Sequence, residues 1–566
     1  MDIFIEIGVI IILAAIFSYL AGISRQPLIP GYVLAGLLVT IFFGEVNTEV
    51  IYTLSEIGIA FLLFIVGLEL SFKKIKNMGG VSLVTGTVQT IILFCVGFFA
   101  MKFLGFAQME STYLGIVIVF SSTMIVVKLL SDSKELDTLH GRLAIGLLLL
   151  QDFFALFALT ALNSAKDITL LYILLFLGKG IFVFLIAWLA SKYVFPKVFE
   201  LAAKSQDLLL IISLSICFLF SLLLHAAGYS IAIGAFIGGL TLANLPYNVE
   251  IISRVKSLRD FFLILFFTSL GLQLQLSGLL NYWLPIVVLS LIVLLFKPIL
   301  IMVTTSIYGY SKKTVFEAGV SLAQISEFSL ILVAQGVILG QISKDLLSIT
   351  IIVAIITMVG TSYLVKFEHI IYSHLSKFIP VFGTLIPHKH IQHQRVKHKK
   401  NYEIVLCGHD RVGYSVLQTL RDQGRKVLVI DYNPDVIKEL FHNHIPCMYG
   451  DVSDIEVLER LDLTKIKLII STANKYEDNE FLLRVIKRIS PHVRVFVSAS
   501  KIDEALDLYK LGADYVILPH FIGGNYVSLI LGEMEKDGAT IHQERFKHME
   551  ELIKRKRLGH NYPMNM

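Results

Sequence analysis

Residues 143–162 read LAIGLLLLQDFFALFALTAL. The segment is apolar and long enough to cross about 30 Å of hydrocarbon as a helix, and its one ionisable side chain, Asp152, lies near the middle. A carboxylate at that depth is costly, so it is a functional candidate by default; an aspartate that merely bonds a neighbouring helix is the structural alternative. The stretch predicts a membrane helix built around a polar site.

The sequence around this segment has the same apolar character as far as residue 370. Of the 566 residues, 55% are hydrophobic and only 16% are charged, which excludes a soluble enzyme of this length. Hydropathy and length predict about thirteen spans. They lie near residues 3–21, 29–43, 53–71, 82–104, 112–130, 142–162, 170–190, 207–225, 229–245, 260–279, 283–306, 315–335 and 345–366.

The loops between these segments predict the orientation of the chain in the membrane. Nearly all their lysines and arginines fall on one side, for example Arg25, Lys192 and Lys313, whereas the other side holds only Lys102, Lys166 and Lys344. The positive-inside rule makes the rich side cytoplasmic. We therefore expect a multi-pass plasma-membrane protein with its N-terminus outside and its C-terminal part in the cytosol. The net charge of +5 reflects these loops and needs no nucleic-acid partner.

Two pairs of segments predict an internal repeat. Residues 30–38 (PGYVLAGLL) are similar to 234–240 (GAFIGGL), and 67–70 (GLEL) are similar to 271–274 (GLQL). An odd number of spans separates the copies in each pair, which turns the second copy upside down in the bilayer. Chance is the alternative, because glycine and leucine are common in membrane helices.

Asp152 and its neighbour Gln151 suggest a one-for-one exchange. A buried carboxylate can hold either a proton or a cation but not both, so alternating access to one such group gives exchange. Because Gln151 is neutral, the pair carries a single titratable charge. This favours electroneutral transport. The only metal expected is the transported cation at Asp152.

A buried cation and two polar breaks complete the candidate transport site. Lys297 precedes Pro298 deep in a span and could pair with Asp152; snorkelling to the interface is the alternative. Matching spans of the two repeats are interrupted, and interrupted helices at such positions form substrate sites. The alternative is that the serine and threonine hydroxyls in these spans only bond carbonyls of their own helix and have no part in ion binding. The interrupting residues are Ser121, Ser122 and Thr123 in one span and Gln324, Ser326 and Glu327 in the other.

These motifs together resemble the Kef-type branch of the cation:proton antiporter superfamily. The similarity rests on the segments 26–36, 68–70, 121–123, 151–152, 234–236 and 326–328. It implies a dimeric thirteen-helix antiporter with broken helices that cross near Asp152, and it associates the Gln-Asp pair with potassium/proton exchange. Ser326 departs from the family, which often has glycine before this glutamate.

The C-terminal sequence predicts a dinucleotide-type fold. After a basic linker, 371–400, that we expect to contact anionic lipid, a strand ends at Cys407. The turn Gly408, Asp410, Arg411 and Gly413 then opens a helix, and a second strand ends in Asp431. Further strands are predicted near 468–471, 493–497 and 515–518. A metal- or pH-sensing role for the linker histidines is the alternative.

Residues 401–520 resemble the nucleotide-binding half of RCK (TrkA-N) regulatory domains, including Gly450-Asp451. The resemblance implies binding of NAD(H) or an adenine nucleotide and a role as a dimeric gating module. Asp410 stands where the fingerprint has its middle glycine, and its carboxylate repels a pyrophosphate. We therefore expect AMP or another mononucleotide to bind better than NAD(H), with no obligatory cofactor.

The sequence thus predicts a polytopic α-helical membrane protein with a cytosolic α/β Rossmann-like domain. Its expected parts are an antiporter domain (1–370), the linker (371–400), an RCK N domain (401–520) and a charged tail (521–566). The expected function is electroneutral potassium/proton antiport by a homodimer, regulated by nucleotide, and not enzymatic catalysis. A sodium/proton antiporter and a channel-like potassium efflux system remain alternatives.

Overall fold

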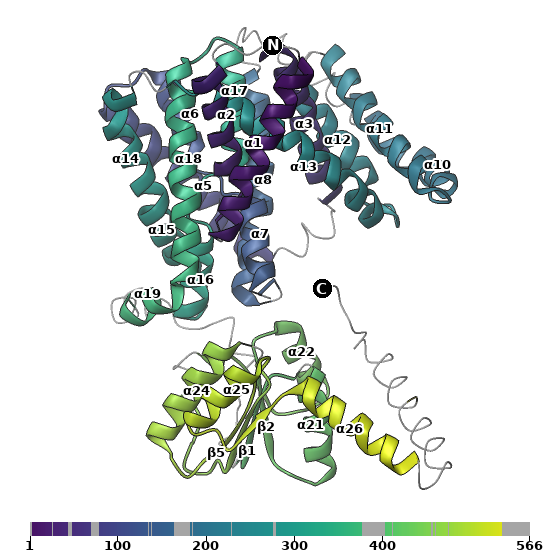
Figure 1. Cartoon of the computed structure of the whole chain (residues 1–566), viewed down its shortest axis with the longest axis vertical. Helices are drawn as coiled ribbons and strands as arrows, with labels where there is room; N and C mark the ends of the chain where they lie inside the picture. Colours follow the sequence, from purple (N-terminus) through teal and green to yellow (C-terminus); the bar gives the residue numbers. More distant parts are fainter. Residues whose placement is uncertain are drawn as a thin grey trace. The chain divides into compact units, whose positions relative to one another are not determined.

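The computed structural model describes residues 3–24, 26–43, 48–69, 79–133, 135–136, 138–163, 182–183, 185–227, 229–275, 279–308, 310–375, 402–409, 411–453, 457–458, 460–473, 475–534 and 549. The chain forms two compact units, Met1–His390 and Ile391–Met566. The first is all helical and the second is an α/β domain (Figure 1).

The helices of the first unit are mostly apolar throughout, as expected of elements buried in lipid or in protein. Six of the described helices are long and apolar enough to cross a membrane. The elements are α1 (Ile3–Ile23), α2 (Ile29–Phe43), α3 (Thr48–Glu69), α5 (Gly79–Phe103), α6 (Gln108–Val117), α7 (Thr123–Asp132), α8 (Leu139–Asn163), η1 (Ala190–Val194), α10 (Phe195–Ala202), α11 (Gln206–Ala226), α12 (Ile231–Leu242), α13 (Asn248–Leu272), η2 (Leu279–Tyr282), α14 (Trp283–Leu291), η3 (Ile292–Phe296), α15 (Lys297–Ser306), α16 (Lys312–Ser321), α17 (Glu327–Ile338), α18 (Lys344–Lys366) and α19 (Glu368–Leu375).

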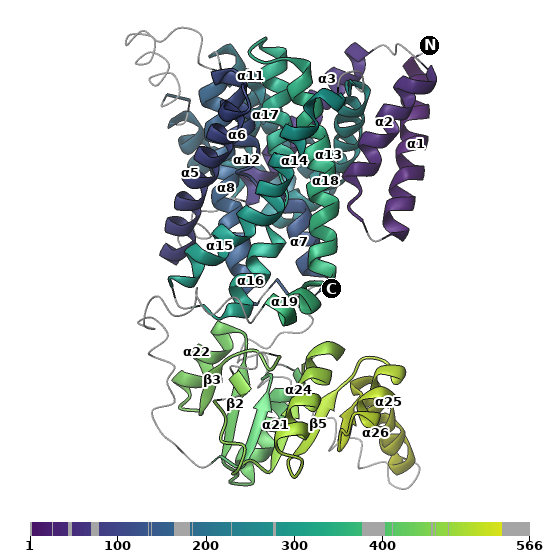
Figure 2. The ribbon, with the colours of Figure 1, turned by 90° about the vertical axis from the view of Figure 1, so that its left-hand side faces the viewer.

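Glycines bring α2 and α13 into backbone contact. A Cβ on Gly36 would collide with the Thr268 carbonyl oxygen, and one on Gly271 would collide with the Val33 carbonyl oxygen. Helix α1 packs beside α2 in the same part of the unit (Figure 2). The small residues are therefore required by the closeness of the two helices, as in other membrane-helix interfaces.

Helices α3 and α12 meet in the same way. A Cβ on Gly67 would collide with the Phe236 carbonyl oxygen, and one on Gly239 would collide with the Phe64 carbonyl oxygen. In the repeat predicted from sequence, α2 corresponds to α12 and α3 to α13. The α2–α13 contact then corresponds to the α12–α3 contact, so the packing has the symmetry that the repeat predicts.

The second unit is a six-stranded parallel sheet in the order β3-β2-β1-β4-β5-β6. Its central strand pairs on both sides, with Val405 opposite Leu428 and Ile469. This is the doubly wound order, with its switch point between β1 and β4. The strands are β1 (Ile404–Cys407), β2 (Val427–Asp431), β3 (Cys447–Tyr449), β4 (Leu468–Ser471), β5 (Arg494–Ser498) and β6 (Tyr515–Ile517).

Helices cover both faces of this sheet (Figure 1). Leu417 and Leu440 belong to the core on one face, and Leu482, Ile486 and Leu508 belong to the core on the other. The helices are α21 (Arg411–Asp422), α22 (Pro434–His442), α24 (Tyr476–Ile489), α25 (Ile502–Lys510) and α26 (Pro519–Met534). Both faces are buried, which explains the continuous apolar strands. The predicted fold class, a membrane-spanning helical part followed by a Rossmann-like domain, is confirmed.

Candidate functional site

Two interrupted helices form the frame of the membrane site. Helix α6 ends at Val117 and α7 begins at Thr123, whereas α16 ends at Ser321 and α17 begins at Glu327. Each second half starts from a serine N-cap. Ser122 accepts a hydrogen bond from the Ile125 amide at 3.2 Å, and Ser326 accepts one from the Phe328 amide at 3.1 Å. The first backbone amides of a helix have no partner within that helix, and these serine side chains accept hydrogen bonds from them. A new helix can therefore begin after each serine, which explains the position of the two breaks.

Asp152 of α8 lies beside the start of α7. Its side chain is 2% exposed, and Oδ2 accepts a hydrogen bond from the Thr123 hydroxyl at 3.0 Å. Its other oxygen, Oδ1, is buried and has no hydrogen-bond partner among the residues that the structure describes. The N-terminus of α7 carries a partial positive charge that stabilises a nearby carboxylate. Asp152 therefore has one buried oxygen whose hydrogen-bonding capacity is unused by the described residues.

Gln151 of α8 forms a hydrogen bond with the break between α6 and α7. Its Oε1 accepts a hydrogen bond from the Ser121 amide at 2.9 Å, and the Ser121 hydroxyl donates to the Leu322 carbonyl at 3.0 Å. The side-chain oxygen of Gln151 is thus engaged by backbone. The ion-binding role that the sequence suggests for Gln151 stays a prediction, and in the structure its side-chain oxygen also positions the first break.

A direct bond joins the two breaks. The Ser122 hydroxyl donates to Oε1 of Glu327 at 2.6 Å, and the Ser326 hydroxyl reaches Oε2 at 3.5 Å. Glu327 is the first residue of α17, where a carboxylate offsets the positive helix end. Glu327 therefore lies at the second break, and its part in ion transport stays a prediction.

Lys297 contacts the opposite ends of the half-helices. Its amine is completely buried and donates to the carbonyls of Phe120 and Gln324 at 3.0 Å each. These carbonyls follow α6 and α16, whose C-terminal ends carry partial negative charge. The predicted pairing with Asp152 is not what the structure shows, because backbone carbonyls satisfy the amine. The π-helical turn Ile292–Phe296 before it absorbs the break in helix bonding that Pro298 imposes.

Backbone atoms and distant charges are the parts of the site that sequence reasoning missed. The carbonyls of Phe120 and Leu322 have no sequence signature. The negative charges of Glu327 and of Glu69 of α3 also act on Asp152, and the positive charge of Arg259 of α13 acts on Glu327. Glu69 belongs to the repeated segment 67–70, and Arg259 lies directly before the predicted span 260–279, but neither was a candidate site residue. The side chain of Gln324, a predicted ion ligand, is buried, and neither of its polar atoms has a hydrogen-bond partner in the described part of the chain.

The glycine turn of the C-terminal unit has the shape that the fingerprint predicts. Gly408 has φ of 90°, a conformation that favours glycine. A Cβ on Gly413 would collide with the Gly408 carbonyl oxygen. The hydroxyl of Thr472, which directly follows the neighbouring strand β4, donates to the carbonyls of Cys407 and Gly408 at 3.2 and 3.1 Å. The turn is thus held tightly at the carboxyl edge of the sheet.

Asp431 closes this turn from the end of β2. Its Oδ2 accepts from the His409 amide and its Oδ1 from the Asn433 amide, both at 2.7 Å. Asp451 accepts from the amide and hydroxyl of Ser453 at 2.9 and 2.7 Å. Asp410 and the side chain of Arg411 lie outside the described residues, so the argument about pyrophosphate remains a prediction.

The thiol of Cys407 lies buried at the base of the turn. Burial, together with the charges of Asp431 and Asp451, raises the pKa of Cys407 to about 12. A thiol that stays neutral is a poor nucleophile and metal ligand.

Interrupted helices around a buried carboxylate define the membrane unit as a transporter. The chain belongs to the sodium/hydrogen exchanger transmembrane family, whose model matches residues 9–367, and residues 404–519 match the TrkA-N domain. The Kef-type assignment made from sequence is confirmed. The family consists of transporters and not of enzymes.

Several curated proteins are similar to the chain. K(+) efflux antiporter 4 of Arabidopsis thaliana is 27% identical over 380 residues, which is 64% of this chain and 63% of that protein. Glutathione-regulated potassium-efflux system protein KefC of Escherichia coli O81 is 26% identical over 500 residues, covering 86% and 77%. The chain spans less than two thirds of some of these relatives, 63% and 66% of two Arabidopsis antiporters.

A solved structure is also similar to the membrane unit. The sodium proton antiporter MjNhaP1 from Methanocaldococcus jannaschii has 17% identity and a TM-score of 0.49. The similarity covers 66% of this chain and 97% of that one.

Proposed function

We propose that this chain exchanges potassium ions for protons across the cell membrane, with Asp152 as the shared binding group. One observation carries the proposal. The carboxylate is buried where two interrupted helices meet, and among the described residues only one of its oxygens has a hydrogen-bond partner. A buried oxygen without a partner can take a proton or a cation, and it cannot hold both.

The surrounding bonds support a one-for-one exchange. Lys297 and Glu327 are engaged by the ends of the half-helices, and Gln151 is neutral. Asp152 is then the group that changes between a proton and a cation in each cycle. Loading one monovalent cation and unloading one proton leaves the net charge of the site unchanged. The proposed transport is electroneutral and proceeds by alternating access to this site.

Potassium is proposed as the cation because the similar proteins are named as potassium efflux antiporters. The test is proton movement in proteoliposomes after addition of lithium, sodium, potassium or rubidium salts, with simultaneous recording of current. We expect the largest proton flux with potassium and no accompanying current. A larger flux with sodium would make the chain a sodium/proton antiporter. A potassium current without proton movement would indicate a channel.

We further propose that the TrkA-N domain lies in the cytosol of a homodimer and controls exchange by binding an adenine nucleotide. Gly408, Gly413 and Asp431 form the phosphate turn and the ribose acceptor at the carboxyl edge of the sheet. A nucleotide regulates transport only through its difference in affinity for active and inactive states. That coupling is typically about 1–3 kcal/mol.

Asp431→Ala is expected to weaken nucleotide binding about 10- to 100-fold, because a charged acceptor of two short hydrogen bonds is lost and hydrogen bonds to charged groups contribute about 1.5–3 kcal/mol. The measurement is calorimetry of the full-length protein with AMP and with NAD. Wild type is expected to prefer AMP. Asp462→Ala is the control, because the contacts of Asp462 with described residues are those with Thr464 and Lys465 in its own exposed turn. Undiminished AMP binding in Asp431→Ala would contradict the site.

A further inference from the structure

The last residue of α3 carries a charge that reaches the transport site. Glu69 is half-buried, and its negative charge acts on Asp152 together with the charge of Glu327. Glu327 accepts a hydrogen bond from Ser122 at the breaks and lies in the field of the positive charge of Arg259. Glu69, by contrast, belongs to neither break, so it brings a negative charge to Asp152 from a separate helix.

Two kinds of contact fix the end of α3. Its glycine contact with α12 holds the two backbones together. The side-chain amide of Asn248 also donates to the Leu68 carbonyl at 3.3 Å and to the Ala243 carbonyl at 2.9 Å. Ala243 directly follows α12, and Asn248 begins α13. The last turn of α3 is therefore tied to both neighbouring helices, which gives Glu69 a defined position.

Helices α3 and α13 run in opposite directions. The Ser55 hydroxyl donates to the Ser269 hydroxyl at 3.2 Å. A Cβ on Gly58 would lie 2.9 Å from the Phe262 carbonyl oxygen. Residue numbers thus rise along α3 where they fall along α13. The C-terminal ends of the two helices consequently lie at opposite ends of the pair.

Glu69 and Gln273 are equivalent residues of the predicted inverted repeat. Each is the third residue of its matching segment, GLEL in α3 and GLQL at the end of α13. From the rise of a helix per residue, Glu69 lies about 21 Å along α3 from Ser55. Gln273 lies about 6 Å beyond Ser269 in the other direction, and its side-chain amide donates to the Ser269 carbonyl at 3.2 Å. One end of the repeat pair thus carries a carboxylate and the other a neutral amide.

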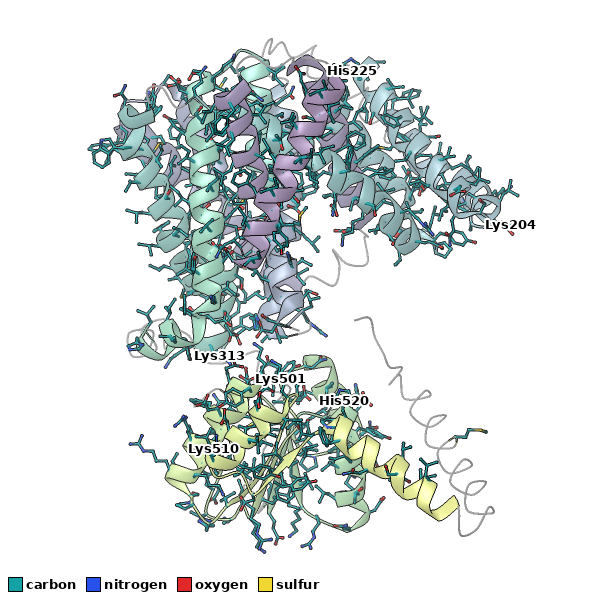
Figure 3. The ribbon with its side chains drawn as sticks, viewed as in Figure 1. Lys204, His225, Lys313, Lys501, Lys510 and His520 are labelled. Atoms are coloured by element: carbon teal, nitrogen blue, oxygen red, sulfur yellow. The ribbon has the colours of Figure 1, made fainter. Side chains whose placement is uncertain are left out.

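These two ends face opposite sides of the membrane unit. Figure 3 labels His225, near the end of α11, on one side and Lys313, near the start of α16, on the other. Helix α12 packs on α11 and runs back from the His225 side, so its far end, to which α3 is tied, lies toward the Lys313 side. Three lysines closely follow Glu69 in the sequence, whereas residues 274–296 contain no charged side chain. In the orientation that the positive-inside rule predicts, Glu69 lies on the cytoplasmic side and Gln273 on the outer side.

We propose that Glu69 raises the affinity of the transporter for its cation on the cytoplasmic side, and that the neutral Gln273 leaves the affinity on the outer side lower. The proposal rests on the proposed exchange at Asp152. A negative charge beside a low-dielectric site raises the local concentration of cations. A cation that enters from the cytoplasm is attracted by Glu69 as well as by Asp152, whereas one that enters from outside meets an amide at the equivalent position.

The effect depends on the net charge of this side and not on an unoccupied oxygen. Glu69 has other interactions within the chain, and glutamine at this position removes one negative charge whatever those interactions are. The same charge attracts protons to Asp152, so it favours both substrates and leaves the equilibrium of the exchange unchanged. The charge changes the concentration at which the cation loads from each side. This change is clearest at alkaline pH, where few protons compete for Asp152.

The test is the KM for potassium on each side of the membrane at alkaline pH. It is obtained from proton flux in everted and right-side-out vesicles of cells that produce the full-length protein and lack other potassium exchangers. Wild type is expected to have the lower KM on the cytoplasmic side. Glu69→Gln is expected to raise that KM about fivefold and to leave the outer KM unchanged. Gln273→Glu is expected to lower the outer KM by a similar factor and to leave the cytoplasmic KM unchanged.

Two further variants control for structural effects. Glu69→Asp keeps the charge and should keep the cytoplasmic KM near the wild-type value. Glu200→Gln removes an exposed carboxylate from α10, which the positive-inside rule places on the cytoplasmic side, and should match wild type.

Unchanged KM values in folded Glu69→Gln, or an equal rise on both sides, would overturn the proposal. If Glu69→Gln fails to fold, an unaltered outer KM in Gln273→Glu would overturn it as well. So would a cytoplasmic KM in Glu69→Asp that is raised as much as in Glu69→Gln. These results are distinguishable from failure of the proposed function, because potassium-driven proton flux in wild type, and its loss in an Asp152 variant, would persist.

Discussion

Asp152→Asn is expected to abolish cation-driven proton movement, with a loss of at least about 100-fold. Asparagine has nearly the same shape and can keep the contact with Thr123, but it neither binds a proton reversibly nor offers a negative charge to a cation. Loss of one charge interaction worth about 2.7 kcal/mol already lowers a rate or binding constant 100-fold. The measurement is the initial rate of proton flux after addition of potassium to proteoliposomes.

The control for this loss is a surface aspartate. Asp207→Asn changes an exposed residue in the first turn of α11 and should leave the rate unaltered. Because Asp152 is buried and its Oδ1 has no partner among the described residues, its neutral variant is also expected to fold at least as well as wild type. Thermal unfolding in detergent checks this point. Exchange at the wild-type rate in Asp152→Asn would remove Asp152 from the mechanism.

The residue types of the membrane site were predictable, but its pairings were not. The polar residues of the two breaks and the isolated Asp152 stand out in an apolar sequence. Because polar and charged groups are costly in a membrane, their presence there indicates a function. The partner of Lys297 depends on where the ends of α6 and α16 lie in space. Sequence suggested the nearest opposite charge, whereas the structure provides two carbonyls of interrupted helices. Backbone acceptors cannot be read from residue types.

The Rossmann-like domain was easier to predict because its signals are local. A strand, a glycine turn, a helix and a strand ending in Asp431 follow one another closely, and the known handedness of such units fixes the topology. Its less predictable feature is the use of Asp431. The acid expected to hold a ribose also binds the amides of His409 and Asn433, so it shapes the turn before any nucleotide is present.

The glycine contacts of the membrane unit give the other prediction with a large effect. Gly239→Leu and Gly271→Leu are expected to prevent folding, because the new side chains would collide with the backbones of α3 and α2 respectively. Backbone atoms in a packed helix pair cannot move aside as a flexible side chain can, and overpacking of this kind exceeds the usual cost of about 1–3 kcal/mol. The measurement is the fraction of monodisperse protein after extraction in mild detergent.

Gly8→Leu and Gly22→Leu are the matched controls, since a Cβ at either position meets no atom within 4 Å. They carry the same change of residue on an apolar helix, α1, and should behave as wild type. The glycines on the opposite helix of each pair provide a second test. If α2–α13 and α3–α12 are symmetry-related contacts, Gly36→Leu and Gly67→Leu should fail to the same extent as their counterparts. A folded and active Gly239→Leu protein would show that the close approach of α3 and α12 is not needed, and the structural basis for the inverted repeat would then be lost.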